Sequence, residues 1–163
     1  MVLSALDPLV VVAIVTNGLL AGLFFAFTCA VTVGFRDVDD RTYIQAFRAI
    51  NTAILNRRFL LAFFAAPLTA VVSAVLLPWR GNPTPLLWLG LGAICSALTF
   101  LITAAVNVPL NRALDRATVS SEAHVRDARQ QFEPRWNRWH HTRTLTSTAA
   151  LVSFALAVVL ERG

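Results

Sequence analysis

Residues 86–110 read LLWLGLGAICSALTFLITAAVNVPL, and none of these side chains carries a charge. About 20 mostly apolar residues in an α-helix are enough to cross the ~30 Å hydrocarbon core of a bilayer. Within that core every backbone N–H and C=O group needs a partner in the protein, which an α-helix supplies along its own length. The stretch therefore predicts a transmembrane helix.

Three further runs are long and apolar enough to be spans. They are Leu9–Phe35, Phe59–Trp79 and Trp136–Leu160, and the apolar part of the last begins only at Leu145. Apolar residues make up 56% of the chain and charged residues 14%, which is too apolar for an ordinary soluble domain. We predict an all-α integral membrane four-helix bundle, with residues 1–163 forming a single four-span membrane domain.

The basic residues indicate an orientation. All 14 are arginine, and only Arg80 and Arg162 fall outside the two long connections and the start of the fourth span. The positive-inside rule then places both connections in the cytoplasm and both termini outside, and we expect the plasma (inner) membrane. Contact with anionic lipid headgroups accounts for the net charge of +5, so we expect the lipid bilayer and no nucleic acid as partner.

The connection between the first two predicted spans has the pattern of an amphipathic helix. Four apolar side chains follow one helical stripe, namely Tyr43, Phe47, Ile50 and Ile54. Asp39 or Asp40 is suited to cap its start. We expect this cytoplasmic helix to lie on the membrane face or to lengthen the first pair of spans.

The second long connection, residues 111–134, is polar and carries both signs of charge. It is predicted to continue the third helix into the cytoplasm and to break near Ser120 and Ser121. A short helix is then expected to end before Pro134, because the residue before a proline is biased away from helical conformation.

Polar side chains form one stripe on the third span and another at the start of the fourth. The first stripe consists of Ser96, Thr99, Thr103, Asn107 and Asn111, at steps of three or four residues. The second consists of Trp136, His140, Arg143 and Ser147, bordered by Trp139 and Thr144. Pro109 removes a backbone donor and predicts a kink. We expect the stripes to meet near the cytoplasmic boundary, with Thr28 and Thr32 at the same depth.

Tryptophan and arginine also collect at membrane interfaces without any catalytic role. That alternative leaves unexplained the asparagines on either side of Pro109 and the two histidines, which titrate near neutral pH. Ionisable residues within a membrane are functional candidates by default. The sequence therefore predicts a polar pocket at the cytoplasmic end of the bundle.

Two segments resemble the signature of a small membrane family that contains the fungal anthrone oxygenases. They are AVNVPLNRAL at 105–114 and RWNRWHHTRT at 135–144, and GLLAGLFFAF at 18–27 resembles the family's glycine-containing first helix. The resemblance implies oxidation of an aromatic or polyketide-like substrate by dioxygen within the bundle. It assigns to the site Asn107, Pro109, Asn111, Trp136, Trp139, Arg143 and either His140 or His141.

For such a reaction we expect one histidine to remove an acidic proton, while the guanidinium and the amides stabilise the resulting enolate. The expected catalytic residues are His140, His141, Arg143, Asn107 and Asn111. The expected substrate contacts are Trp136 and Trp139, as an aromatic wall, with Thr103 and Thr28. The substrate would be a small hydrophobic aromatic molecule, and its carbanion can pass an electron to dioxygen without a cofactor.

Other hypotheses remain open from the sequence. Haem b is one alternative cofactor, with His140 or His141 as axial ligand, because helical bundles often bind haem through histidine. The scarcity and spacing of ligands disfavour zinc or another metal, and no GxGxxG motif suggests a flavin or nicotinamide. A non-enzymatic ligand-binding or haem-binding protein, or a packing subunit of a larger membrane complex, is the rival class. A homo-oligomer is compatible with either.

Overall fold

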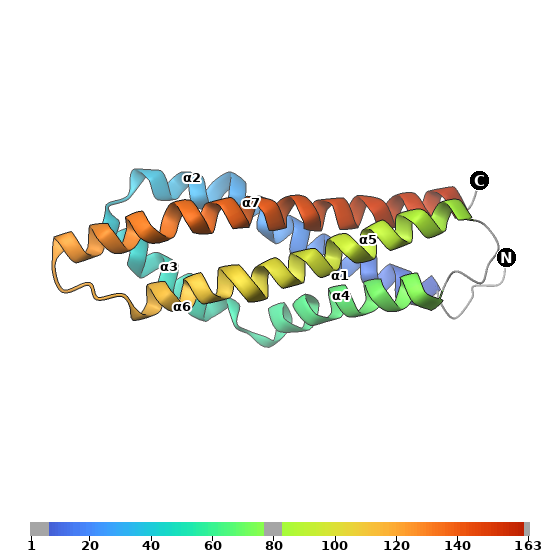
Figure 1. Cartoon of the computed structure of the whole chain (residues 1–163), viewed down its shortest axis with the longest axis horizontal. Coiled ribbons are helices and arrows are strands. Elements are labelled where there is room, and N and C mark those ends of the chain that lie inside the picture. Colours follow the sequence, from blue (N-terminus) through green and yellow to red (C-terminus); the bar gives the residue numbers. More distant parts are fainter. Residues whose placement is uncertain (1–6, 77–82, 162–163) are drawn as a thin grey trace.

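The structure, a computed structural model, describes residues 7–76 and 83–161, and this part of the chain is helical without any strand. Four long helical segments lie side by side along the long axis of the molecule (Figure 1). Each is long and apolar enough to cross a membrane, and they comprise Pro8–Asp37, Arg57–Leu76, Pro85–Arg116 and Glu122–Glu161. The protein is therefore an all-α integral membrane bundle, as the sequence predicts.

The spans contain several helical elements. The first consists of α1 (Asp7–Ala26), the π-helical turn η1 (Phe27–Val31), α2 (Thr32–Gly34) and the 3-10 turn η2 (Phe35–Asp37). After α3 (Asp40–Ile54) the second span is α4 (Arg57–Leu76). The third consists of α5 (Pro83–Ile102), the π-helical turn η4 (Thr103–Asn107) and α6 (Val108–Arg116), and the fourth is α7 (Glu122–Glu161). The predicted end of the second span, residues 77–79, lies outside the described residues.

The four spans pack as a ring of neighbours. Helix α1 contacts α4 and α7, and α5 contacts the same two helices. Small side chains fill the interior, where Ala13, Ala66, Ala70, Ser73 and Ala150 have no exposed surface. Close approach through small residues is how helices associate in lipid, where burial of apolar surface gives little drive. Large apolar side chains such as Leu61, Leu87 and Leu145 point outward, as expected for a surface in contact with lipid.

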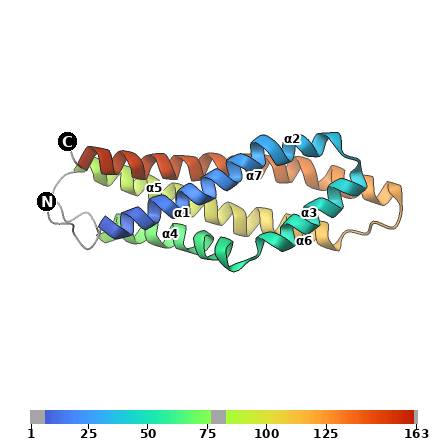
Figure 2. The same cartoon turned by 180° about the vertical axis from the view of Figure 1, so that it is seen from behind.

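Both arginine-rich connections lie at one end of the bundle, formed by α3, α6 and the first half of α7 (Figures 1 and 2). We call it the arginine-rich end. It contains the arginines between positions 36 and 58 and between 112 and 138. Arg80 and Arg162 lie outside the described residues.

Helix α3 is the amphipathic helix that the sequence predicts, and Asp39 caps it. The Asp39 carboxylate accepts hydrogen bonds from the Thr42 backbone N–H at 3.0 Å and from its hydroxyl at 2.6 Å. Tyr43, Ile44 and Phe47 are buried. They pack against α6 and α7, so the apolar face of this predicted helix is covered by protein.

The connection 111–134 breaks where predicted, after Arg116, but its second half differs from the prediction. Helix α7 begins at Glu122 and continues through Pro134 without interruption. Pro134 lies on an exposed face, while Phe132 and Trp136 on either side of it are buried against α3. Packing on that buried face offsets the loss of one backbone hydrogen bond, which proline causes by lacking an N–H.

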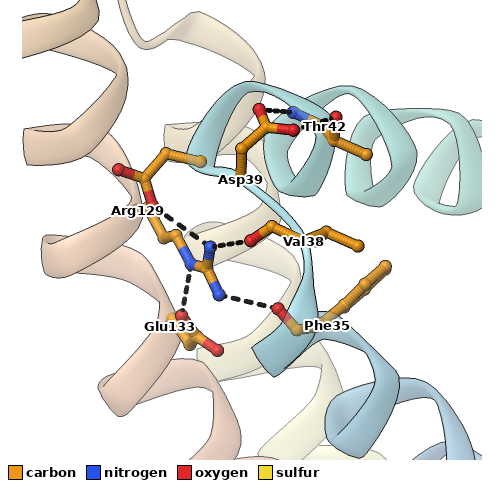
Figure 3. Close-up of polar contacts among 7 residues, drawn as sticks. Phe35, Val38, Asp39, Thr42, Arg129 and Glu133 are labelled. Carbon is orange, nitrogen blue, oxygen red and sulfur yellow. Dashed lines mark hydrogen bonds and ion pairs between the residues drawn. The ribbon is translucent and has the colours of Figure 1, made fainter.

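Arg129 of α7 forms hydrogen bonds with the end of the first span (Figure 3). Its guanidinium donates to the backbone carbonyls of Phe35 at 2.7 Å and Val38 at 2.9 Å. It also bonds the carboxylates of Glu133 at 2.7 Å and Asp40 at 3.1 Å. Five N–H groups in a fixed fork make arginine suited to such convergent acceptors. The contact holds η2, α3 and α7 together at the arginine-rich end.

We predict that Arg129→Lys lowers the free energy of unfolding by about 1–3 kcal/mol, because an ammonium group cannot reach all four acceptors at once. Unfolding in mixed micelles with increasing SDS measures the change. Arg126→Lys is the matched control, since Arg126 is exposed three residues earlier on the same helix. Equal effects of the two variants would contradict the role of Arg129.

A second prediction concerns the contact of α5 with α7. A Cβ atom added at Gly92 would lie 2.9 Å from the fully buried Phe154 ring, whereas one added at Gly90 meets nothing within 4 Å. Gly92→Ala should therefore cost about 1–3 kcal/mol in stability through overpacking. Gly90→Ala on the same helix should be neutral or slightly stabilising, because alanine favours helix. The same SDS titration compares them.

Candidate functional site

Two π-helical turns face α7 at the arginine-rich side of the membrane spans. In η1 the Thr32 N–H bonds the Phe27 carbonyl, and in η4 the Val108 N–H bonds the Thr103 carbonyl. Each bond spans five residues, so the helix widens locally. The turn η4 ends two residues before Pro109, so the distortion predicted at this proline takes the form of a π-helical turn. Such turns are frequent at functional sites.

His140 lies between these two turns with no exposed surface. Its Nδ1 is 3.1 Å from Nε and 3.0 Å from Nη2 of Arg143. A guanidinium can only donate, so Nδ1 is the acceptor and the ring proton lies on Nε2. That N–H donates to Thr28 Oγ1 of η1 at 3.0 Å. Both ring nitrogens of His140 are thus engaged within the protein.

Arg143 is a buried cation, 8% exposed. Its Cζ lies 4.3 Å from the centroid of the Phe24 ring and 5.2 Å from that of Trp136, within the range of cation–π attraction. No carboxylate of the described residues forms an ion pair with it. A buried charge without a counter-ion is costly, and the faces of two aromatic rings and one imidazole nitrogen offset only part of that cost.

Trp136 links the fourth span to α6 and α3. Its ring is stacked on that of His140, with centroids 4.6 Å apart and an interplanar angle of 13°. The indole N–H donates to Asn111 Oδ1 at 2.8 Å, and Asn111 Nδ2 donates to Asn51 Oδ1 at 2.6 Å. Asn51 was not predicted from the sequence. Its position four residues after Phe47, on the apolar stripe of α3, is the signal that could have found it.

Asn107, at the end of η4, has no exposed surface. Its Nδ2 is 3.5 Å from the Trp136 carbonyl, at the limit of hydrogen bonding. Within the described part of the chain, its Oδ1 has no hydrogen-bond partner. An unsatisfied buried acceptor of this kind calls for a donor from a water molecule or a ligand.

A cavity of about 270 Å³ lies beside this cluster. Most of its wall is apolar, and its aromatic members are Phe24, Phe27, Phe47, Phe59 and Trp136. Polar groups reach it from Asn51, Thr103, Asn111 and Arg143. Four exposed lining residues mark an opening between the end of α3 and α6, namely Thr52, Leu55, Arg112 and Asp115, and Leu23 of α1 is also exposed. An apolar cleft with a few convergent polar groups is typical of a small-molecule site.

Comparison with known proteins identifies the family. The model of the anthrone oxygenase family matches residues 52–153, well over half of the chain. The protein belongs to the anthrone oxygenase family. No curated protein and no solved structure shows significant similarity to it. The segment matched to the anthrone oxygenases includes η4, α6 and the part of α7 that carries His140 and Arg143.

The structure brings most of the predicted site residues of this anthrone oxygenase family member together. Thr103, Asn111, Trp136 and Arg143 line the cavity. His140 and Asn107 lie outside its lining and contact Arg143 and Trp136, which form it. Thr28 also lies outside the lining and bonds His140. His140 is thus the inward-facing member of the doubled histidine.

Two predicted residues lie elsewhere. His141 is exposed, and Trp139 is 38% exposed and does not line the cavity. The aromatic wall consists instead of Trp136 and phenylalanines of α1, η1, α3 and α4. Trp139 and His141 flank His140 on α7, and each points about 100° away from it, so both side chains are exposed while His140 is buried.

Among the described residues, the side chains that could coordinate iron or another metal do not fit haem or a metal ion. His140 has no free ring nitrogen to coordinate iron, and His141 faces outward. His124 is exposed and its Nδ1 lies 2.9 Å from the Ser120 hydroxyl. No cluster of three His, Cys, Asp or Glu residues that could hold a metal occurs within residues 7–76 and 83–161.

We predict that His140→Leu lowers the free energy of unfolding by about 1–2 kcal/mol, because Arg143 then loses its hydrogen-bond acceptor. His141→Leu is the matched control: the same substitution at the next, exposed position should change stability little. SDS-induced unfolding followed by circular dichroism measures both variants. If His141→Leu were as destabilising as His140→Leu, the buried contact would not be the cause.

Proposed function

We propose that the protein is a membrane oxygenase that oxidises a small, enolisable aromatic substrate with dioxygen in the cavity. Membership of the anthrone oxygenase family supports the reaction class. The proposal for the site rests on Arg143, a buried cation without a carboxylate partner among the described residues. It lines a largely apolar cavity that contains five aromatic side chains. Such a wall suits a planar aromatic anion.

In this proposal Arg143 binds the enolate oxygen of the substrate. A cation that already lies at the place where negative charge develops stabilises the enolate without reorganisation, more strongly in a site that excludes water. The rings of Phe47 and Trp136, whose centroids are 4.8 Å apart at 85°, provide apolar surface for the substrate rings. Asn111 keeps Trp136 in its orientation through the indole N–H.

The chemistry requires no reductant from outside. A methylene group next to a carbonyl and two aromatic rings loses a proton to give the enolate. The enolate passes one electron to dioxygen, and the two radicals combine to form a C–O bond and, after protonation, a hydroperoxide. Loss of water from the hydroperoxide leaves a second carbonyl. The sum is CH₂ plus O₂ giving C=O plus H₂O, in which four electrons move from carbon to oxygen.

His140 takes a different role in this proposal from the general base expected from the sequence. Both of its nitrogens are engaged, by Arg143 and by Thr28, and the ring does not line the cavity. It positions the guanidinium. We propose that the substrate proton leaves through the opening, where the exposed Asp115 carboxylate can accept it.

The position of the opening supports access from the membrane surface. Leu55 at the opening is 64% exposed, beside the polar Arg112 and Asp115. An apolar substrate dissolved in the bilayer can reach such a border without crossing water. We propose that the arginine-rich end faces the cytoplasm from the inner membrane, with both termini outside, because arginine-rich connections are retained on that side.

Oxygen consumption with anthrone as substrate tests the function. Arg143→Gln should lower kcat at least about 100-fold, the usual effect of removing one preorganised electrostatic group. Arg138→Gln, an exposed arginine on the same helix, should leave kcat unchanged. A wild-type protein that binds anthrone but consumes no oxygen would contradict the enzymatic proposal and favour a non-enzymatic ligand-binding protein.

A further inference from the structure

The hydrogen bonds from Trp136 to Asn51 have a direction set by chemistry. An indole N–H can only donate, so Asn111 must present Oδ1 to it and Nδ2 to the other side. Asn51 must then present Oδ1 to Asn111, as the 2.6 Å contact indicates. The Nδ2 of Asn51 is left over, and no acceptor within the described part of the chain bonds it. Since Asn51 lines the cavity, its wall carries an amide donor with a fixed orientation.

We infer that Asn51 is a specificity-determining residue, whose amide N–H binds a second oxygen of the substrate while Arg143 binds the first. This inference rests on the proposed function of the cavity. The two donors come from different helices, α3 and α7, and the apolar surfaces of Phe47 and Trp136 belong to the same cavity. The ligand that matches this arrangement is a planar aromatic molecule with one anionic oxygen and a second, separate hydrogen-bond acceptor.

Discrimination by such a group can be large. A site that hydrogen-bonds a substrate hydroxyl rejects the analogue without it, because the polar group of the protein then loses its partner. Asn51 is only half-buried at the side of the opening, so water can satisfy its N–H when the cavity holds no ligand. The resulting preference is therefore moderate, about tenfold for one hydrogen bond.

A purely structural role for Asn51 must be separated from ligand binding. Asn51→Asp retains an oxygen that accepts from Asn111 Nδ2, so the chain of hydrogen bonds to Trp136 is preserved, but it replaces the donor by an acceptor. Asn51→Leu removes both functions at similar volume. Gln45→Glu makes the same amide-to-carboxylate change on an exposed face of α3 and serves as the control.

The experiment measures dissociation constants without oxygen, so that no turnover occurs. The ligands are anthrone and monomethoxyanthrones with the methoxy group at each outer-ring position in turn, because an ether oxygen accepts a hydrogen bond but cannot donate one; they are titrated into protein in lipid nanodiscs. In the wild type and in Gln45→Glu, one methoxyanthrone should bind about tenfold more tightly than anthrone. In Asn51→Asp and Asn51→Leu this ratio should fall to about one, with the SDS unfolding midpoint of Asn51→Asp unchanged.

Other results overturn the inference. A ratio that persists in Asn51→Asp, or the absence of any preferred methoxyanthrone in the wild type, would exclude Asn51 as a substrate contact. The outcome is separable from the proposed function. Selective binding without oxygen consumption would leave Asn51 as part of a ligand site while the oxygenase proposal fails. Oxygen consumption with anthrone, together with binding that is indifferent to a ring methoxy group, would support the oxygenase and exclude this role of Asn51.

Discussion

The contact of the Arg143 guanidinium with His140 Nδ1, between the rings of Phe24 and Trp136, is the constraint on which the site depends. A cation within membrane-spanning helices is stable only with partners, and here they are a neutral imidazole and two aromatic faces rather than a carboxylate. Thr28 then fixes the imidazole from the first span. The same arrangement leaves the positive charge available to an anionic ligand, so stabilisation of the fold and binding in the cavity place opposing demands on one side chain.

The cavity is enclosed because the bundle continues beyond the length that the membrane requires. Helix α3 packs its apolar face on α6 and α7, and Arg129 fastens the start of α3 and the end of the first span to α7. Phe47 and Asn51 reach the cavity only through this packing. The π-helical turns also shape this region. They widen the first and third spans where Thr28, Thr103 and Asn107 face α7.

Much of the fold could be predicted from the sequence, because a helix that crosses lipid must be long, apolar and internally hydrogen-bonded. The four spans, the amphipathic helix with its Asp39 cap, and the stripe of His140 and Arg143 follow from run length and helical periodicity. The continuous helix through Pro134 did not follow, since local preference predicts a break there and only the packing of Phe132 and Trp136 on α3 reverses it. The hydrogen bond between Arg143 and His140 could not be predicted from the sequence either. Periodicity places side chains on one face but does not state which atom of an imidazole accepts and which donates.

The sequence by itself determined that the chain crosses a membrane four times and gathers its polar side chains at one end, because the cost of polar groups in lipid acts on each segment separately. Only the tertiary structure decided that His140 rather than His141 faces inward, that Thr28 of the first span bonds His140, and that Asn51 lines the cavity. Those features depend on distances between helices far apart in the chain. A hydrogen bond requires a donor–acceptor distance of about 3 Å. The residue pattern of one helix does not specify its distance to side chains on another helix.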